Sequence, residues 1–286
     1  MATYEHKVEI PVGPGTIAGT VVTPGTRIPG VLFVHGWGGS QQQYLARARE
    51  IAALGCVCLT FDLGGHAGTQ PQRETVSRES NLRDLLAAYD VLAAHPHVDP
   101  AAIAMVGSSY GGYLAAIATT ERAVKWLALR VPALYIDTGW EVPKLQLHKD
   151  QDLRSYRRSV VPASKNRALR ACLAFEGDVL LVESEHDDII PRPVLTSYRE
   201  AFVQSRSLTY RCLPGADHGL TDEASQRAYT TLLVQWLAEM MPNARRPEPA
   251  EAGRSTAARE AAAIDAATGP LPEAPPTAAA TGAAAA

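Results

Sequence analysis

Short apolar runs alternate with amphipathic segments along most of the chain. The segment 80–94 is one of the amphipathic ones, because Leu82, Leu85, Tyr89 and Leu92 recur at the spacing of a helical face. Apolar strands that alternate with amphipathic helices are typical of a parallel sheet with helices on both faces. The pattern therefore predicts an α/β fold with a mostly parallel central sheet.

The elements of this fold can be placed by their residue ranges. The predicted strands are 31–34, 56–61, 103–106, 126–131, 179–183 and 208–213, and the predicted helices are 41–54, 80–94, 110–120, 193–204 and 221–241. Near the N-terminus, segments 7–12 and 16–23 alternate polar and apolar residues around Gly13-Pro14-Gly15, which predicts an antiparallel hairpin. Residues 132–175 lack a core strand pattern, and we expect a short cap insertion over the sheet there.

The last 44 residues, 243–286, contain 18 Ala and 6 Pro and few large apolar residues. Such a segment buries too little apolar area to offset the entropy lost on ordering it. We therefore expect a disordered Ala/Pro-rich tail after a single domain that covers residues 1–242. The sequence does not indicate a role for this tail.

Composition and charge restrict the class of protein. The formal net charge is −3, with 46% hydrophobic and 20% charged residues, which argues against a general nucleic-acid or membrane-surface binder. The N-terminus carries Glu5, His6, Lys7 and Glu9 where a secretory signal is apolar, so we expect a cytoplasmic protein. The cysteines, which are Cys56, Cys58, Cys172 and Cys212, are expected to be small buried hydrophobic residues rather than disulfides or metal ligands.

A candidate nucleophile follows the third apolar strand. Gly107-Ser108-Ser109-Tyr110-Gly111 joins strand 103–106 to a predicted helix, which is the setting in which a G-x-S-x-G motif indicates a nucleophile. The flanking glycines permit a tight turn, and Ser109 would lie at a helix N-terminus that favours developing negative charge. Taken alone, the same pentapeptide could be a helix cap without chemistry.

A serine hydroxyl needs a base, and the base needs an orienting carboxylate. His218 lies in a glycine-flanked loop after strand 208–213, and Asp187 lies in an acidic loop after strand 179–183. The open α/β sheets place their sites at the carboxyl ends of strands, where both loops are expected. The order Ser109, Asp187, His218 along the chain is the order expected for a Ser-His-Asp triad of this kind of fold.

A loop after the first apolar strand supplies a fourth component of the candidate active site, in addition to the serine, the histidine and the aspartate. His35-Gly36-Trp37-Gly38-Gly39 is similar to loops whose backbone N–H joins that of the residue after the nucleophile in an oxyanion hole. The predicted donors are therefore the backbone N–H groups of Trp37 and Tyr110. We expect His35 to brace this loop rather than take part in catalysis.

Together these motifs resemble the α/β-hydrolase family over about residues 20–241. The segment Ser109-Tyr110-Gly111-Gly112-Tyr113 and the short N-terminal hairpin resemble the dienelactone hydrolase, feruloyl esterase and prolyl oligopeptidase-like branches. Dienelactone hydrolases typically have a cysteine nucleophile, and this chain has Ser109 in that position. The segment 61–68, with sequence FDLGGHAG, departs from the FDxRGxGxS of the family, and we assign it structural support only.

The resemblance implies a serine hydrolase that cleaves carboxylic esters through an acyl-enzyme intermediate, with a small-molecule ester as substrate and no cofactor or metal. Cleavage of amides or peptides by the same residues is the alternative. A non-catalytic binding protein of the same fold is disfavoured, because such proteins usually lose a triad residue and none is missing here. The sequence does not settle acyl and alcohol specificity, the structure of the cap or the oligomeric state.

Overall fold

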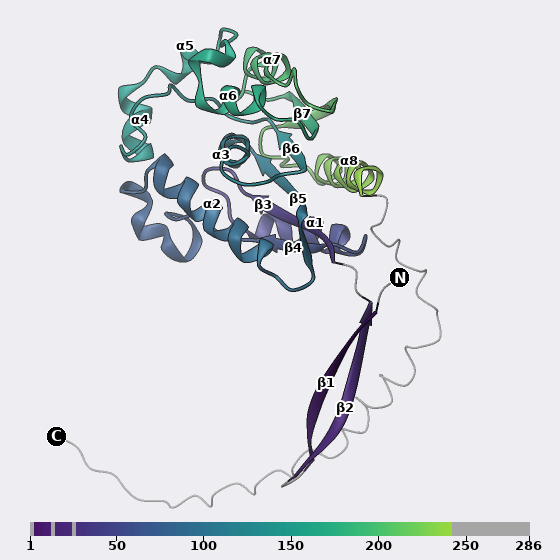
Figure 1. Ribbon diagram of the computed structural model, residues 1–286. Coiled ribbons are helices and arrows are strands. Elements are labelled where there is room, and N and C mark those ends of the chain that lie inside the picture. The colour runs from purple at the N-terminus through teal and green to yellow at the C-terminus, as the bar shows by residue number, and fades with distance from the viewer. Residues whose placement is uncertain (1–2, 13–14, 25–26, 242–286) are drawn as a thin grey trace, which may run out of the picture. The chain divides into compact units, whose positions relative to one another are not determined.

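A six-stranded sheet forms the centre of the fold (Figure 1). Its strands are β3 (Ile28–Val34), β4 (Val57–Thr60), β5 (Val98–Ser108), β6 (Trp126–Arg130), β7 (Asp178–His186) and β8 (Ser207–Asp217). They are parallel throughout and lie in the order β4-β3-β5-β6-β7-β8. This arrangement confirms the predicted parallel sheet. The computed structural model describes residues 3–12, 15–24 and 27–241, so the tail expected over 243–286 lies outside the described residues.

Helices cover both faces of this sheet. Helices α1 (Gln42–Ala52) and α8 (Glu223–Met240) pack on one face, while α2 (Arg78–Ala93), α3 (Tyr110–Ala118) and α7 (Arg192–Ala201) pack on the other. Strand β3 contributes side chains to the cores on both faces of the sheet, because successive side chains of a strand point to opposite sides. Val31 and Phe33 join the core under α1 and α8, whereas Leu32 and Val34 join the core under α2 and α3. A strand buried on both faces therefore has a continuous apolar sequence.

The segment expected as a cap, residues 132–175, contains short helices. They are α4 (Lys144–Asp150), α5 (Leu153–Tyr156), the 3-10 helix η2 (Ala163–Lys165) and α6 (Arg167–Leu173). Helix α6 contacts α3 and α7, and Leu134, Leu153 and Leu169 belong to the same core as α3. The segment is thus packed into the main core on the α3 face of the sheet.

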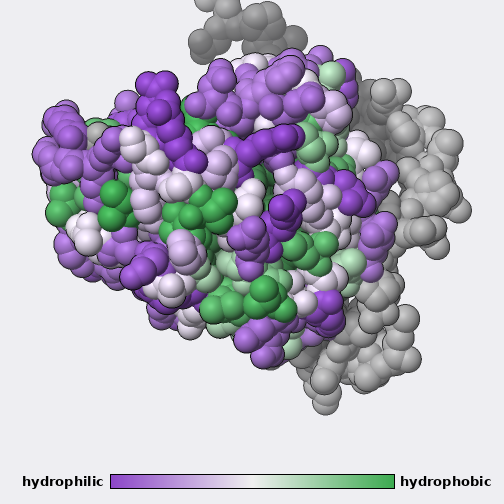
Figure 2. All heavy atoms as spheres, turned by 90° about the horizontal axis from the view of Figure 1, so that it is seen from above, coloured by the Kyte–Doolittle hydropathy of each residue, from purple (hydrophilic) through white to green (hydrophobic). Residues whose placement is uncertain are grey.

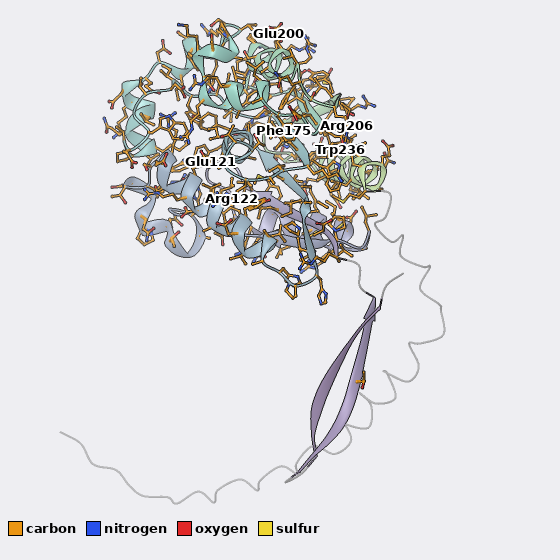
Figure 3. All side chains as sticks on the ribbon, in the orientation of Figure 1. Glu121, Arg122, Phe175, Glu200, Arg206 and Trp236 are labelled. Atoms are coloured by element: carbon orange, nitrogen blue, oxygen red, sulfur yellow. The ribbon has the colours of Figure 1, made fainter. Side chains whose placement is uncertain are left out.

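Figure 3 labels one large residue from each core. Phe175, which follows α6, belongs to the core on the α3 side, where its ring lies edge-on to Phe202 at 6.3 Å. Trp236 of α8 belongs to the core on the other side.

The face seen in Figure 2, viewed from above with respect to Figure 1, mixes hydrophilic and hydrophobic residues. The exposed large hydrophobic side chains of the described residues include Val91, Val160, Ile189 and Val203.

Strands β1 (Thr3–Val12) and β2 (Gly15–Pro24) pair antiparallel with each other as a separate two-stranded sheet. The remaining element, the 3-10 helix η1 (Ala67–Glu74), follows β4. Among the described residues, none of the helices has both the length and the apolar character required to cross a bilayer.

The start of helix α2 and the exposure of the cysteines are among the features that differ from the sequence prediction. Helix α2 begins at Arg78 rather than Ser80, because the Ser77 side chain caps the helix and exchanges hydrogen bonds with Ser80 in a capping box. The expectation that all cysteines are buried holds for Cys56 and Cys172, but Cys58 is half-buried and Cys212 is exposed. Strand β8 lies at the edge of the sheet, and much of it remains accessible to solvent.

Candidate active site

Ser109 lies at a tight turn between β5 and α3. Its φ of 53° and ψ of −118° are strained for any residue except glycine. A Cβ added at Gly111 would lie 2.2 Å from the carbonyl oxygen of Val34, and one at Gly107 would lie 2.7 Å from that of Gly111. The Ser109 N–H donates to the Arg130 carbonyl at 2.9 Å. The glycines therefore permit this turn, and a hydrogen bond to β6 fixes it.

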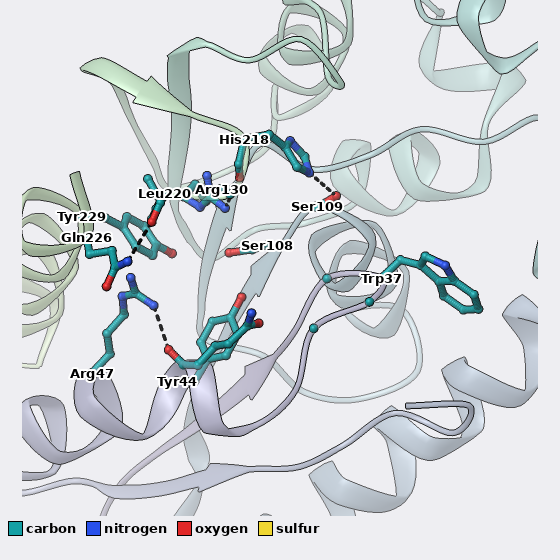
Figure 4. Close-up of a pocket in the computed structure, with 15 residues that line it drawn as sticks. Trp37, Tyr44, Arg47, Ser108, Ser109, Arg130, His218, Leu220, Gln226 and Tyr229 are labelled. Atoms are coloured by element: carbon teal, nitrogen blue, oxygen red, sulfur yellow. Dashed lines mark hydrogen bonds between the residues drawn. The ribbon is translucent and has the colours of Figure 1, made fainter. Parts of the chain in front are cut away.

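His218 lies beside this serine. The residue directly follows β8, and its imidazole Nε2 is 3.0 Å from the Ser109 Oγ (Figure 4). Its Nδ1 lies 2.7 Å from Oδ2 of Asp187, which directly follows β7. Because an ionised carboxylate can only accept, Nδ1 carries the proton and the neutral Nε2 is left to accept from the serine hydroxyl. The structure thus brings the predicted Ser109, His218 and Asp187 into one chain of hydrogen bonds.

The end of β7 and the loop after it offer three carboxylates with different environments. The Asp187 side chain is 2% exposed, and its Oδ1 accepts from the backbone N–H groups of Ile189 at 2.8 Å and Ile190 at 2.7 Å. Glu185 instead accepts from the Gly215 N–H at 2.8 Å, and Asp188 is exposed. Only Asp187 combines burial, backbone donors and the imidazole, so it is the carboxylate that can orient His218.

The loop 35–39 approaches the nucleophile from β3. A Cβ at Gly36 would lie 3.3 Å from both the Ser108 carbonyl oxygen and the Ser109 Cβ, which shows how closely the loop passes the serine. Within the part of the chain that the structure describes, no hydrogen bond uses the backbone N–H of Trp37 or of Tyr110. Both predicted donors are therefore available to an oxygen atom bound next to Ser109.

His35 braces this loop, as expected. It is buried, and its Nε2 accepts from the Leu63 N–H at 3.0 Å while its Nδ1 lies 2.8 Å from the Gly36 carbonyl oxygen. Burial lowers the pKa of His35 below its ordinary value, which favours the neutral form that these two contacts require. The segment 61–68 thus supports the loop through the Leu63 backbone.

A cavity of about 310 Å³ opens at the serine. In Figure 4 Trp37, Ser109 and His218 lie toward one side of it, and Arg47 and Tyr229 lie toward the other. The volume is near the lower end of the range for sites that bind small molecules. Among the described residues, no group of three or more His, Cys, Asp and Glu side chains is arranged to hold a metal ion.

Sequence reasoning missed two buried basic side chains near this site. Arg130 ends the apolar strand β6 and is 5% exposed; its guanidinium donates to the Ser184 Oγ at 3.0 Å and to the His218 carbonyl oxygen at 2.8 Å. A charged residue at the carboxyl end of a buried strand is a signal that could have identified it. Lys144 begins α4 and is 1% exposed, and its sequence neighbours give no sign of this burial.

Lys144 lies among aromatic rings that belong to the candidate site. Its Nζ is 4.0 Å from the ring centroid of Trp37, 4.9 Å from that of Tyr110 and 5.2 Å from that of Tyr135. Burial, reinforced by the positive charges of Arg157, Arg73 and Arg78, lowers the pKa of Lys144 from 10.5 to about 6. The two residues predicted to form the oxyanion hole thus pack their rings around an amine from the cap segment.

Comparison with known proteins adds a family and a fold. The model of the prolyl oligopeptidase family matches residues 46–244. The chain is 25% identical over 171 residues to "Palmitoyl-protein thioesterase ABHD10, mitochondrial" of Homo sapiens, a match that covers 58% of this chain and 52% of that protein. The chain therefore spans about half the length of this relative. It is also 26% identical over 217 residues to an uncharacterized protein of Mycobacterium tuberculosis, with 76% of this chain and 72% of that protein covered.

Solved structures resemble the chain over most of its length. The dienelactone hydrolase from Anabaena variabilis ATCC 29413 superposes with a TM-score of 0.53 at 20% identity, covering 83% of this chain and 98% of that one. A puromycin-hydrolyzing peptidase from Mycobacterium tuberculosis gives a TM-score of 0.58 at 18% identity, covering 83% of this chain and 40% of that one. At these identities the matches establish the fold, which is that of the α/β-hydrolases.

Proposed function

Because the chain belongs to the prolyl oligopeptidase family, we propose that it is a serine hydrolase that cleaves carboxylic esters through an acyl-enzyme intermediate. The observation that carries the proposal is the hydrogen-bonded series from the Ser109 Oγ through the His218 imidazole to Asp187, at 3.0 Å and 2.7 Å. This series starts at a strained turn that presents the hydroxyl next to a cavity.

The proposed reaction begins when the Ser109 Oγ attacks the ester carbonyl carbon and His218 Nε2 takes the hydroxyl proton. Asp187 stabilises the imidazolium that forms. The carbonyl oxygen gains negative charge, and the N–H groups of Trp37 and Tyr110 bind it. His218 then gives its proton to the departing alcohol, which leaves Ser109 acylated.

A water molecule completes the cycle. His218 removes a proton from the water, whose oxygen attacks the acyl carbon, and the proton returns to the Ser109 Oγ as the carboxylic acid leaves. The enzyme is restored without any other reactant. The same sequence of steps serves a thioester, where the leaving group is a thiol.

Amide or peptide cleavage is the second candidate, and the match to the prolyl oligopeptidase family favours it. The same residues would act, but the leaving amine must be protonated by His218 before it departs. Matched alanyl substrates distinguish the two candidates: an alanine p-nitrophenyl ester and an alanine p-nitroanilide. The ester proposal expects rapid cleavage of the ester and slow or undetectable cleavage of the anilide.

The test of the mechanism combines labelling and substitution. Treatment with a fluorophosphonate, followed by peptide mass spectrometry, should place the label on Ser109 and leave the adjacent Ser108 unmodified. Ser109→Ala should lower turnover of p-nitrophenyl butyrate by a factor on the order of 10⁶, while the circular dichroism spectrum stays that of the wild type. Label on Ser108, or substantial activity in Ser109→Ala, would refute the assignment of the nucleophile.

A further inference from the structure

Two arginine side chains line the active-site cavity. Arg47 comes from α1, and Arg130 comes from the carboxyl end of β6 (Figure 4). Among the described residues that form the cavity wall, none is an aspartate or a glutamate. A guanidinium group stays protonated in proteins, so the wall presents two positive charges and no fixed negative charge.

Neither arginine forms an ion pair with another described residue. Arg47 donates from Nε to the Thr230 Oγ1 at 3.1 Å and from one terminal nitrogen to the Gln43 carbonyl oxygen at 3.2 Å. Arg130 donates to the Ser184 hydroxyl and the His218 carbonyl, and these acceptors are also neutral. Other arginines of the described residues do form ion pairs with carboxylates, among them Arg122, Arg170 and Arg206.

Both guanidinium groups lie close to the ring of Tyr229. Arg47 is 5.1 Å and Arg130 is 5.6 Å from the ring centroid of Tyr229. Burial lowers the pKa of Arg130, and the like charge of Arg47 adds to this effect. Asp187 and Asp217 act on Arg130 through space, but Asp187 is bound to His218 and Asp217 to Thr221. Two like charges in a partly dry cavity are stabilised most by an anion between them.

We propose that this cavity binds the substrate through an anionic group, a carboxylate or a phosphate, that pairs with Arg47 and Arg130 while the ester carbonyl lies at Ser109. The proposal rests on the proposed function for the chemistry at the ester. Guanidinium groups match both anions through paired N–H donors. The small cavity suits a short chain, so the simplest substrate of this class is the monoester of a short dicarboxylic acid.

The activity test compares two p-nitrophenyl esters of similar length, the anionic hemisuccinate and the neutral butyrate. Wild type should show the higher kcat/KM for the hemisuccinate. Arg47→Gln should lower kcat/KM for the hemisuccinate by about tenfold or more, mainly through KM, because a hydrogen bond between charged groups is lost. For the butyrate kcat/KM should fall by a clearly smaller factor, since that ester has no anion to bind.

Arg49 provides the matched control. It lies on the same helix, is exposed and does not line the cavity. Arg49→Gln removes the same charge and should leave both kcat/KM values unchanged. If Arg49→Gln and Arg47→Gln lower hemisuccinate hydrolysis equally, the effect is general electrostatic attraction and the subsite is refuted. Equal loss on both esters in Arg47→Gln would also refute it.

Calorimetry tests the subsite independently of catalysis. Glutarate and inorganic phosphate are titrated separately into wild type and into Arg47→Gln. The proposal expects binding of at least one of them to wild type, with about tenfold weaker binding to the variant. Absence of binding by both to wild type would overturn the subsite. If no ester is hydrolysed but glutarate binds in an Arg47-dependent manner, the proposed function fails and the anion site stands.

Discussion

Replacement of Lys144 by methionine should stabilise the protein, and more so at lower pH. Lys144 is 1% exposed, and its pKa of about 6 in the folded state compares with an ordinary value of 10.5. Between these two pH values the unfolded chain binds a proton that the folded chain does not. Stability therefore falls as the pH falls, by about 1.4 kcal/mol for each pH unit. Below about pH 6 both states are protonated and the loss stops growing.

The stability lost at a given pH follows from the difference between that pH and the ordinary lysine pKa of 10.5. At about pH 7.5 that difference is about 3 units, which corresponds to roughly 4 kcal/mol of lost stability. Methionine is similar in length, fills the same space and does not titrate. The free energy of unfolding of Lys144→Met should thus exceed that of wild type by an amount that grows by about 3 kcal/mol between about pH 9 and pH 7.

Urea denaturation, followed by circular dichroism at several pH values, measures this difference. Lys149→Met is the control, since Lys149 lies on the same helix α4 and is exposed. Its unfolding free energy should stay within about 0.5 kcal/mol of wild type at every pH. If the difference between Lys144→Met and wild type is the same at pH 7 and pH 9, Lys144 keeps its proton in the folded state and the reasoning is refuted.

Two further substitutions address the acid and the turn. Asp187→Asn should lower turnover of p-nitrophenyl butyrate by roughly 10⁴ through loss of control over the His218 tautomer. The side chain of Asp188 is exposed, so Asp188→Asn should lower turnover by about tenfold or less. A larger loss from Asp188→Asn than from Asp187→Asn would overturn the acid assignment. Gly111→Ala should lower the Tm by several degrees or more, because its Cβ would lie 2.2 Å from the Val34 carbonyl oxygen. A thermal unfolding curve that matches wild type would contradict the tight-turn geometry.

Much of the fold could be predicted because a strand buried on both faces has a distinctive sequence. One such strand segment consists of four residues that are 0–1% exposed and alternate between the two cores, namely Val31, Leu32, Phe33 and Val34. Their continuous apolar sequence therefore indicates a strand with helices on both faces. The loops after such strands meet at one edge of a parallel sheet. For this reason the sequence could also predict that Ser109 would lie near the loops after β7 and β8.

Side chains whose environment depends on distant elements could not be predicted. Arg78 reads as a surface residue before a helix, yet it is fully buried, donates to the Tyr113 hydroxyl and the Ile136 carbonyl, and lies 4.7 Å from the Trp140 ring centroid. Lys144 is surrounded by rings contributed by three separate segments. No local pattern encodes such neighbours, because they are set by how the cap segment packs on the sheet.

The strained backbone of Ser109 has an evolutionary consequence. A non-glycine residue with φ of 53° and ψ of −118° costs of the order of 1–3 kcal/mol, a sizeable fraction of the net stability of a typical domain. Glycine would adopt the same conformation without this cost, so random drift under selection for stability alone would replace the serine. The proposed role of Ser109 as nucleophile gives a reason for a serine at this position, because glycine cannot supply the hydroxyl.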